Sequence, residues 1–172
     1  MEIERKFTVR SLPENLNAYA CLIIEQAYLC VDPVIRIRRQ DENYYLTYKG
    51  SGMLEREEYN LPLTAQAYRH LLPKADGNVI RKKRFRIPIE HPQFAAGYDP
   101  AADPASGGDK ADLTIELDLF EAPFQNLVIA EVEFASREMA EAFVPPEWFL
   151  EDVTYDGRYH NSYLSRCRPQ AL

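Results

Sequence analysis

The stretch Glu2-Ile3-Glu4-Arg5-Lys6-Phe7 opens the chain with alternating charged and apolar residues. Successive side chains of a β-strand point to opposite faces, so Glu2, Glu4 and Lys6 would share one face. Two carboxylates about 7 Å apart, two strand rises, can share a hydrated divalent cation. Taken alone, such a stretch more often marks a solvated strand face. It gains weight here because later segments repeat the pattern.

Charged residues recur at every second position in several later segments that we expect to be strands. The alternating segments are 34–40, 54–61, 79–89, 113–120 and 127–135, and β-rich segments at 21–31 and 44–49 accompany them. Their charges are sorted by sign, with carboxylate pairs at Glu2/Glu4, Glu116/Asp118 and Glu131/Glu133, and cations at Arg36/Arg38, Lys49 and Lys82/Arg84. A sheet with one wet face explains any single strand, but it explains this sorting poorly.

The remaining segments predict a few helices and one long loop. Helices are expected over 11–20 with Ser11 as cap, over 64–72 with Thr64 as cap, and over 136–143 with Ser136 as cap. The segment His91–Asp112 is rich in Pro, Ala, Gly and Asp and predicts a mobile surface loop. Residues 151–154 look extended, and the tail 155–165, with helical spacing of apolar residues, is expected to close the structure.

Composition sets the broad class. A chain of 172 residues with 46% hydrophobic and 27% charged residues is typical of one globular domain, taken here as 1–172. A net charge of −7 argues against a nucleic-acid-binding surface. No apolar run approaches membrane-spanning length and the charged start is no signal peptide, so a cytoplasmic protein with no membrane partner is expected. The three cysteines are read as reduced thiols.

Closing about eight antiparallel strands into a barrel turns the charged faces inward and leaves the apolar faces to be covered by helices and loops. The predicted fold is therefore a β-rich α+β structure, a closed antiparallel barrel with a charged interior. Buried like charges need partners, which implies a ligand that carries both signs. Carboxylates favour Mg²⁺ or Mn²⁺, whereas Arg and Lys favour phosphate oxygens, so a metal-bound polyphosphate satisfies both.

At this point the sequence resembles the CYTH or triphosphate tunnel metalloenzyme superfamily. The start Glu2-x-Glu4-x-Lys6 matches the hallmark ExExK of that family, and further matches follow in order to about Leu164. They are Gln26-Ala27-Tyr28-Leu29, Arg36-Ile37-Arg38, Thr47-Tyr48-Lys49, Lys82-Lys83-Arg84, Glu116-Leu117-Asp118-Leu119-Phe120, Ala130-Glu131-Val132-Glu133-Phe134, Pro146-Glu147-Trp148, Asp152-Val153-Thr154 and Arg158-Tyr159-His160-Asn161. The segment 91–112 is longer than expected of short bacterial members.

The resemblance implies an eight-stranded barrel that forms a tunnel, and it implies roles for individual residues. It places Glu2, Glu4, Glu116, Asp118, Glu131 and Glu133 around the metal. It places Lys6, Arg36, Arg38, Lys49, Lys82 and Arg84 around the triphosphate oxygens. Glu2, Glu4 and Lys6 would also take part in catalysis, with Tyr28 beside Lys6, although Tyr28 can equally be a packing residue.

The function expected from the resemblance is metal-dependent hydrolysis of the terminal phosphoanhydride of inorganic triphosphate. The alternatives are a class IV-like adenylate cyclase, a nucleoside or thiamine triphosphatase, and a non-catalytic polyphosphate- or nucleotide-binding module. The partner is a small anionic triphosphate, and the oligomeric state stays open, with a homodimer among the alternatives. P-loop and nucleophile-elbow motifs are absent, and His70, His91 and His160 stand apart, so they are read as surface or packing residues.

Overall fold

Antiparallel strands form the body of the fold in the computed structural model, which describes residues 2–104 and 113–168. The strands are β1 (Glu2–Val9), β2 (Ala20–Val31), β3 (Val34–Gln40), β4 (Asn43–Lys49), β5 (Glu55–Arg56), β6 (Glu58–Leu63), β7 (Asp76–Ile89), β8 (Gln93–Phe94), β9 (Leu113–Phe120), β10 (Val128–Glu133), β11 (Phe143–Val144) and β12 (Phe149–Asp152). The helices are α1 (Ala65–Leu71), α2 (Arg137–Ala142) and α3 (Asn161–Leu164), with short 3-10 turns η1 (Leu16–Ala18), η2 (Leu72–Lys74), η3 (Pro100–Ala102) and η5 (Gly157–Tyr159).

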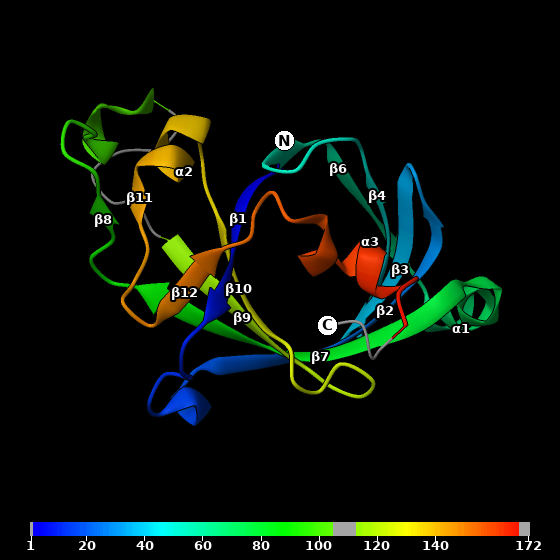
Figure 1. The fold of residues 1–172 in the computed structure, drawn as a ribbon. Coiled ribbons are helices and arrows are strands. Elements are labelled where there is room, and N and C mark those ends of the chain that lie inside the picture. Colours follow the sequence, from blue (N-terminus) through cyan, green and yellow to red (C-terminus); the bar gives the residue numbers. More distant parts are fainter. Residues whose placement is uncertain (1, 105–112, 169–172) are drawn as a thin grey trace.

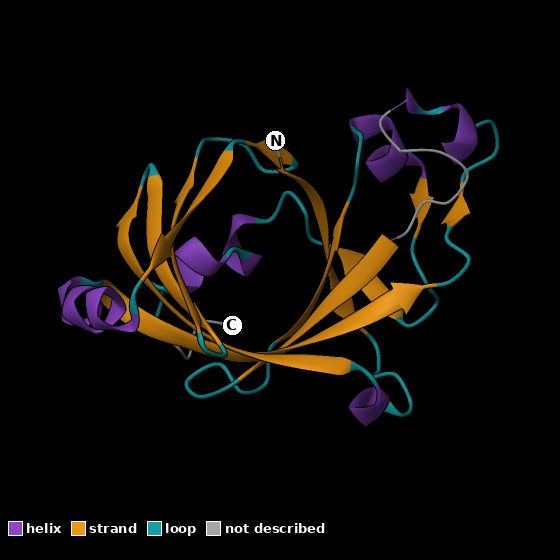
Figure 2. Ribbon diagram, turned by 180° about the vertical axis from the view of Figure 1, so that it is seen from behind, coloured by secondary structure: helices purple, strands orange, loops and turns teal. Residues whose placement is uncertain are grey.

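The sheet curls into a barrel that closes through a short contact. Its strand order is β12-β1-β10-β9-β7-β2-β3-β4-β6, and β5, which directly precedes β6, pairs back with β1. Arg56 lies opposite Glu2, and the Glu4 N–H donates to the Leu54 carbonyl at 3.0 Å. With β5 and β6 taken as one strand and β12 as an addition to β1, the ring is the expected barrel of eight strands (Figures 1 and 2).

The closing strand differs in detail from the prediction of one strand over 54–61. The chain leaves strand geometry at Glu57, between β5 and β6. This break lets β5 pair with β1 while β6 pairs with β4 on the other side of the ring. Local alternation did not reveal this break, because the pairing of β5 and β6 with strands from distant parts of the chain depends on closure of the ring.

Strand register brings charged residues from distant segments onto the inner face. Lys6 lies opposite Glu131, which in turn lies opposite Glu116. On the next pair of strands Arg84 lies opposite Asp118. Directly opposed residues of antiparallel strands share a face, so these charges point into the barrel together. The charged interior expected from the alternation is confirmed over this part of the bore.

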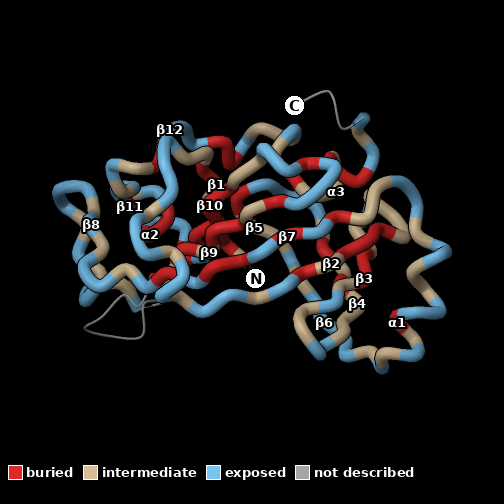
Figure 3. The backbone as a smooth tube through the Cα atoms, turned by 90° about the horizontal axis from the view of Figure 1, so that it is seen from below, coloured by how far each residue is buried: buried red, intermediate tan, exposed pale blue. Residues whose placement is uncertain are grey.

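Apolar side chains occupy the outer faces. The largest cluster joins outward residues of β1, β7, β9 and β10 to α2 and β12; it includes Ile3, Phe7, Phe85, Ile87, Leu117, Val132, Met139, Ala140 and Phe149. Elsewhere on the barrel, Tyr68 of α1 packs with Ala27 and Ile37. Helices therefore cover the outer face as expected, and the buried residues in Figure 3 follow the strands.

The interior is not charged throughout, which corrects one expectation. Ile80 and Phe120 lie two positions along their strands from Lys82 and Asp118, and hence share the same inner face. With Ile129, Tyr28 and Phe124 they pack against Leu164 of α3, which lies within the ring of strands in Figure 1. An apolar cluster therefore fills one part of the bore, and the tail closes the structure there as predicted.

Two of the three predicted helices are confirmed with their caps, and one is wrong. Thr64 accepts a hydrogen bond from the Ala67 N–H at 3.1 Å, and Ser136 accepts one from the Met139 N–H at 3.0 Å. Over 11–20 only the turn η1 forms, after Asn15 at a left-handed φ of 58°. Because β2 already begins at Ala20, the chain has to reverse within this segment, and no room is left for a helix.

The segment expected to be a mobile loop carries more structure than its composition indicates. Phe94 of β8 lies opposite Phe143 of β11, and Phe94 and Tyr98 pack against the largest apolar cluster. Residues 105–112 of the same expected loop lie outside the described residues. The three cysteines are free thiols, as expected. Across the described ranges no helix is long and apolar enough to cross a membrane.

The outer apolar layer is expected to hold the barrel closed. Leu117 is fully buried in it, so Leu117→Ala should lower the free energy of unfolding by about 2–5 kcal/mol. Urea denaturation followed by circular dichroism measures this loss. Leu61 on β6 is 58% exposed and serves as the control, since Leu61→Ala should change stability by less than about 0.5 kcal/mol. Equal losses in both variants would contradict this assignment of the core.

Candidate active site

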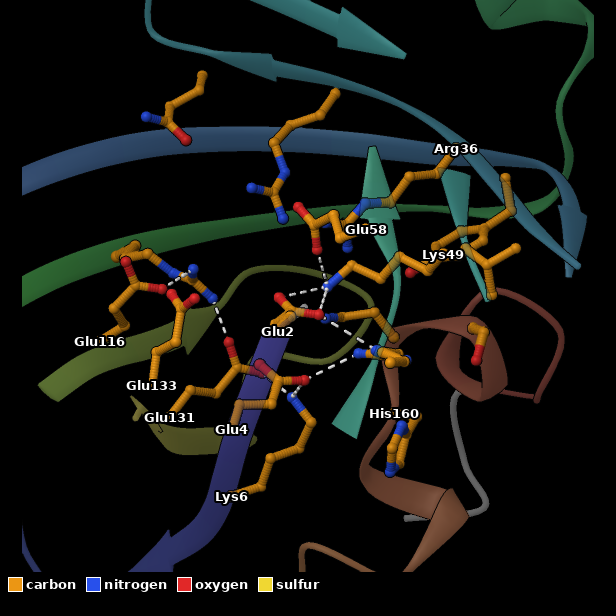
Figure 4. Close-up of a pocket in the computed structure, with 18 of the residues that line it drawn as sticks. Glu2, Glu4, Lys6, Arg36, Lys49, Glu58, Glu116, Glu131, Glu133 and His160 are labelled. Carbon is orange, nitrogen blue, oxygen red and sulfur yellow. Dashed lines mark hydrogen bonds and ion pairs between the residues drawn. The ribbon is translucent and has the colours of Figure 1, made fainter. Parts of the chain in front are cut away.

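The charged part of the bore encloses a cavity of about 210 Å³. Nearly all its walls are charged or polar side chains from β1, β2, β3, β4, β7, β9, β10 and the β5–β6 segment, and α3 covers one side (Figure 4). The lining residues are Glu2, Glu4, Lys6, Leu22, Tyr28, Val34, Arg36, Arg38, Gln40, Lys49, Arg56, Glu58, Arg84, Arg86, Glu116, Glu131, Glu133, His160, Asn161 and Ser162.

Lys6 is held between the carboxylates of Glu4, on its own strand, and of Glu131, opposite it on β10. Its Nζ lies 3.0 Å from Glu4 Oε1 and forms a close ion pair with Glu131. Burial alone would lower the pKa of Lys6, but the two carboxylates outweigh burial and raise it. The pKa of Glu131 is correspondingly held well below its usual value, because Lys6 and Arg84 overcome the effect of burial. Both groups are therefore charged at neutral pH.

Arg56 lies on β5, next to the carboxylates of β1. Sequence reasoning did not assign it to the site. Its Nε donates to Glu2 Oε2 at 3.2 Å and its Nη2 to Glu4 Oε1 at 2.8 Å. The alternation around Arg56 and Glu58 was visible in the sequence. Only the closure of the barrel reveals that the short strand β5 places Arg56 beside β1.

Arg84 connects the acidic strands β9 and β10. Its Nε donates to Asp118 Oδ1 at 2.7 Å and its Nη2 to Asp118 Oδ2 at 2.6 Å, while ion pairs also join it to Glu116 and Glu131. Asp118 also forms a close ion pair with Lys82, and both of these side chains are completely buried. Lys82 and Asp118 therefore lie behind Arg84, outside the cavity lining.

Lys49 of β4 forms ion pairs with carboxylates on two other strands, β1 and β6. Its Nζ lies 2.6 Å from Glu2 Oε2 and 2.5 Å from Glu58 Oε2. Burial and the nearby Arg36 guanidinium lower the pKa of Lys49. For Glu58, Lys49 outweighs the effect of burial and brings the pKa to about 2. Glu58 is the second lining residue that sequence reasoning placed on a strand without assigning it to the site.

The wall formed by β3 carries positive charge without a carboxylate partner. Across the described residues no ion pair includes Arg36 or Arg38, and the Nε atoms of both are buried without a hydrogen-bond acceptor. Burial, followed by repulsion from Arg36 and Arg84, lowers the pKa of Arg38 to about 10. Guanidinium groups that are held close together and unpaired form a site for an anion with several oxygens.

The opposite wall carries an excess of negative charge centred on Glu133. Burial and the carboxylates of Glu2, Glu116 and Glu4 raise its pKa. Glu133 takes part in no ion pair of the ranges 2–104 and 113–168. Unbalanced carboxylate oxygens are the donors that a hard divalent cation prefers, so this wall fits such an ion. As placed, however, no three of the described His, Cys, Asp and Glu side chains form a ready-made metal site.

Tyr28 and His160 line the cavity from its covered side. Tyr28 is 2% exposed and lies opposite Arg36, and none of the described hydrogen bonds joins it to Lys6. His160, expected to be a surface or packing residue, is buried, and its Nε2 lies 3.3 Å from the Thr154 carbonyl oxygen. Burial and the nearby Lys6 lower the pKa of His160, so its imidazole is neutral at neutral pH.

The structure brings most of the residues predicted for the site into one cavity. Those that line it are Glu2, Glu4, Lys6, Tyr28, Arg36, Arg38, Lys49, Arg84, Glu116, Glu131 and Glu133. Lys82 and Asp118 are the two exceptions, and they contact the site through Arg84. Arg56, Glu58, Arg86 and His160 are charged or titratable lining residues that the sequence prediction left out.

Comparison with known proteins shows which family the chain resembles. The family profile of the CYTH domain matches residues 1–122. The chain is 33% identical to an inorganic triphosphatase of Nitrosomonas europaea, with 98% of this chain and 99% of the relative aligned. It is 31% identical to an inorganic triphosphatase of Acetivibrio thermocellus, with 95% and 92% aligned.

A solved structure agrees with the sequence matches. The crystal structure of an inorganic triphosphatase superposes on this fold with a TM-score of 0.67 and 30% sequence identity. The match covers 98% of this chain and 97% of the other. The barrel, the sorted charges and these matches agree along the chain, and the resemblance expected from the motifs is confirmed. The chain belongs to the CYTH domain family.

Proposed function

We propose that this chain hydrolyses the terminal phosphoanhydride bond of inorganic triphosphate with Mg²⁺ or Mn²⁺. The observation that carries the proposal is the pair of unbalanced walls within one cavity. Within the described ranges Arg36 and Arg38 form no ion pair with a carboxylate on one side, and Glu133 adds to an excess of carboxylates on the other. A triphosphate that carries a divalent cation would neutralise both walls at once, and both relatives described above are inorganic triphosphatases.

The cationic side chains would bind and polarise the triphosphate. Arg36 and Arg38 line the same cavity as Lys49 and Arg84, and their buried Nε donors have no acceptor among the described residues. Preorganised positive groups in a cavity with little water stabilise the charge that develops on the transferred phosphoryl group. Lys82 does not reach the cavity, and we assign it, together with Asp118, to holding Arg84 in place.

The carboxylates on the acidic side would hold the metal. Glu2, Glu4, Glu116, Glu131 and Glu133 all line the cavity, and their oxygens suit Mg²⁺ or Mn²⁺. The bound ion would supply charge neutralisation and a more acidic bound water. In the structure Glu4 and Glu131 form ion pairs with Lys6, Glu4 also pairs with Arg56, and Glu2 pairs with Lys49. Those ammonium and guanidinium groups would turn toward phosphate oxygens when the ligand arrives.

Hydrolysis needs no nucleophilic side chain. A water oriented by a carboxylate attacks the terminal phosphorus, the bridging P–O bond breaks, and orthophosphate and pyrophosphate leave. Lys6, which stays protonated beside Glu4 and Glu131, is placed to balance negative charge on the phosphoryl oxygens. Tyr28 contacts the same cavity and is proposed to position the substrate from its closed side.

The cavity favours inorganic triphosphate over a nucleotide. At about 210 Å³ it is smaller than the roughly 300–1,000 Å³ typical of pockets for drug-sized ligands. Among the described lining residues Tyr28 is the one Phe, Tyr or Trp side chain. Tyr44, Tyr45 and Tyr48 of β4 are not among the lining residues, and Tyr44 and Tyr48 pack on Tyr68 and Tyr59. The site therefore offers charge for phosphates and little surface for a base.

Phosphate release tests the proposed function directly. We expect purified protein to release phosphate from inorganic triphosphate much faster than from ATP, thiamine triphosphate or pyrophosphate, with Mg²⁺ or Mn²⁺ present. EDTA should abolish the release because the acidic wall then stays unbalanced. Cyclic AMP and pyrophosphate formed from ATP would instead identify a cyclase, and binding of triphosphate without turnover would identify a binding module.

Glu4→Gln should lower kcat for triphosphate by about 10²-fold or more, the scale of losing one electrostatic element of a transition state. The reason is that Glu4 is a buried carboxylate beside Lys6 and Arg56 at the centre of the acidic wall. Steady-state kinetics measure the loss. The control is Glu141→Gln, since Glu141 is 63% exposed on α2 and should leave turnover unchanged. Unchanged turnover in a folded Glu4→Gln protein would remove Glu4 from the mechanism.

Arg38→Ala should raise the KM for triphosphate about 10-fold or more, because a charge-assisted contact to phosphate is lost. The metal concentration that gives half-maximal activity should change much less, since Arg38 lies on the cationic wall. Arg39, the next residue of β3, has its side chain 46% exposed and provides a matched control, Arg39→Ala. Equal weakening of metal and triphosphate dependence would show that Arg38 supports the barrel instead.

A further inference from the structure

Gln26 is a fully buried polar residue in the wall that carries the unpaired cations. It lies near the middle of β2, opposite Arg38 of β3 on one side and Ile80 of β7 on the other. Directly opposed residues share a face, so its side chain points to the interior with that of Arg38. Gln26 is 0% exposed, and Arg38 lines the cavity whereas Gln26 does not.

Both polar atoms of the Gln26 amide lack a partner. Neither Nε2 nor Oε1 forms a hydrogen bond with any described residue. A buried polar group left in this state costs about 1–3 kcal/mol, and native proteins keep few of them. Thr47, equally buried on β4, shows the ordinary arrangement, because its Oγ1 donates to Asn60 Oδ1 at 2.6 Å.

Most of the buried side-chain atoms that lack a hydrogen bond in the described residues lie on the β2–β3 pair, and the others are Glu58 Oε2 and Asn161 Oδ1. The Nε atoms of Arg38 and Arg36 are also buried without an acceptor, and Arg36 lies opposite Tyr28 two positions along β2. Gln26 and Arg38 are therefore directly opposed residues. One has an unused acceptor, Oε1, and the other an unused donor, Nε–H. Among the described residues no carboxylate forms an ion pair with Arg38: Glu58 attracts it from a distance, whereas Arg36 and Arg84 repel it more strongly.

We infer that Gln26 is a positioning residue for the anion, which acts through Arg38. When triphosphate draws the Arg38 guanidinium toward its oxygens, Gln26 Oε1 accepts the Nε–H and leaves both terminal nitrogens of Arg38 for the ligand. The unpaired amide is therefore an arrangement that the bound anion completes. This inference rests on the proposed function, since it takes triphosphate to be the ligand.

Gln26→Met tests the inference, since Met has a similar length and shape and carries no amide. Removing a buried unpaired amide should leave the unfolding midpoint in urea, measured without ligand, equal to or higher than that of the wild type. The KM for triphosphate should nevertheless rise about 10-fold, the factor for one hydrogen bond to a charged group. The kcat should fall much less than the KM rises, because Gln26 does not touch the reacting atoms.

Thr47→Val is the matched control, because Thr47 is just as buried and its hydrogen bond is already made. This variant should lower the unfolding midpoint and leave the KM unchanged. A lower midpoint for Gln26→Met would overturn the inference, since it would mean that the amide is already satisfied in the free protein. An unchanged KM for Gln26→Met would overturn it as well. A wild-type protein that neither binds nor hydrolyses triphosphate would contradict the proposed function itself, and the inference with it.

Discussion

Charge that is withdrawn from water inside a barrel has to be neutralised, and this constraint organises the whole molecule. A lone ion in a low-dielectric interior is far too costly to persist, so each buried charge needs a partner from the protein or from a ligand. Here Lys6, Lys49, Arg56 and Arg84 take carboxylate partners from other strands. The charged interior is thus largely a network of the protein's own ion pairs.

In the part of the chain that the structure describes, the network is incomplete at two places, and these places define the site. Arg36 and Arg38 on β3 lack acceptors, and Glu133 on β10 sits in an excess of negative charge. Removing one member of a buried ion pair is costly, so a ligand that carries both signs can exchange partners with the network without leaving charges bare. This exchange explains why a carboxylate that would hold a metal, such as Glu4, forms ion pairs with Lys6 and Arg56 in the structure.

Packing outside the bore holds the charged side chains in the positions that a ligand would need. The outer apolar layer fixes the registers of β1, β9 and β10, and therefore which charges face one another. Behind the cavity, Asp118 holds Arg84 through two hydrogen bonds and is itself paired with Lys82. The apolar cluster around Leu164 closes the bore beyond that pair. Charged and apolar parts of the interior therefore support each other.

Much of this arrangement was determined by the sequence itself. Period-two alternation is a local property of a strand, so the strands, their inward faces and the sorting of charges by sign followed from residues such as Glu2/Glu4 and Arg36/Arg38. The family motifs, which run in order along the chain, added the tunnel and the expectation that the polyphosphate is a triphosphate. The caps Thr64 and Ser136 were equally local signals and were confirmed.

Partners across the barrel were decided only by the tertiary structure. Register and closure depend on contacts between residues far apart in sequence, which local patterns do not contain. For that reason Arg56 and His160 were missed, Lys82 and Asp118 proved to lie behind the cavity, and Ile80 and Phe120 made part of the bore apolar. The sequence determined which side chains point inward. The closing of the ring decided which of them meet, because buried charges form ion pairs only with partners that the fold brings within contact distance.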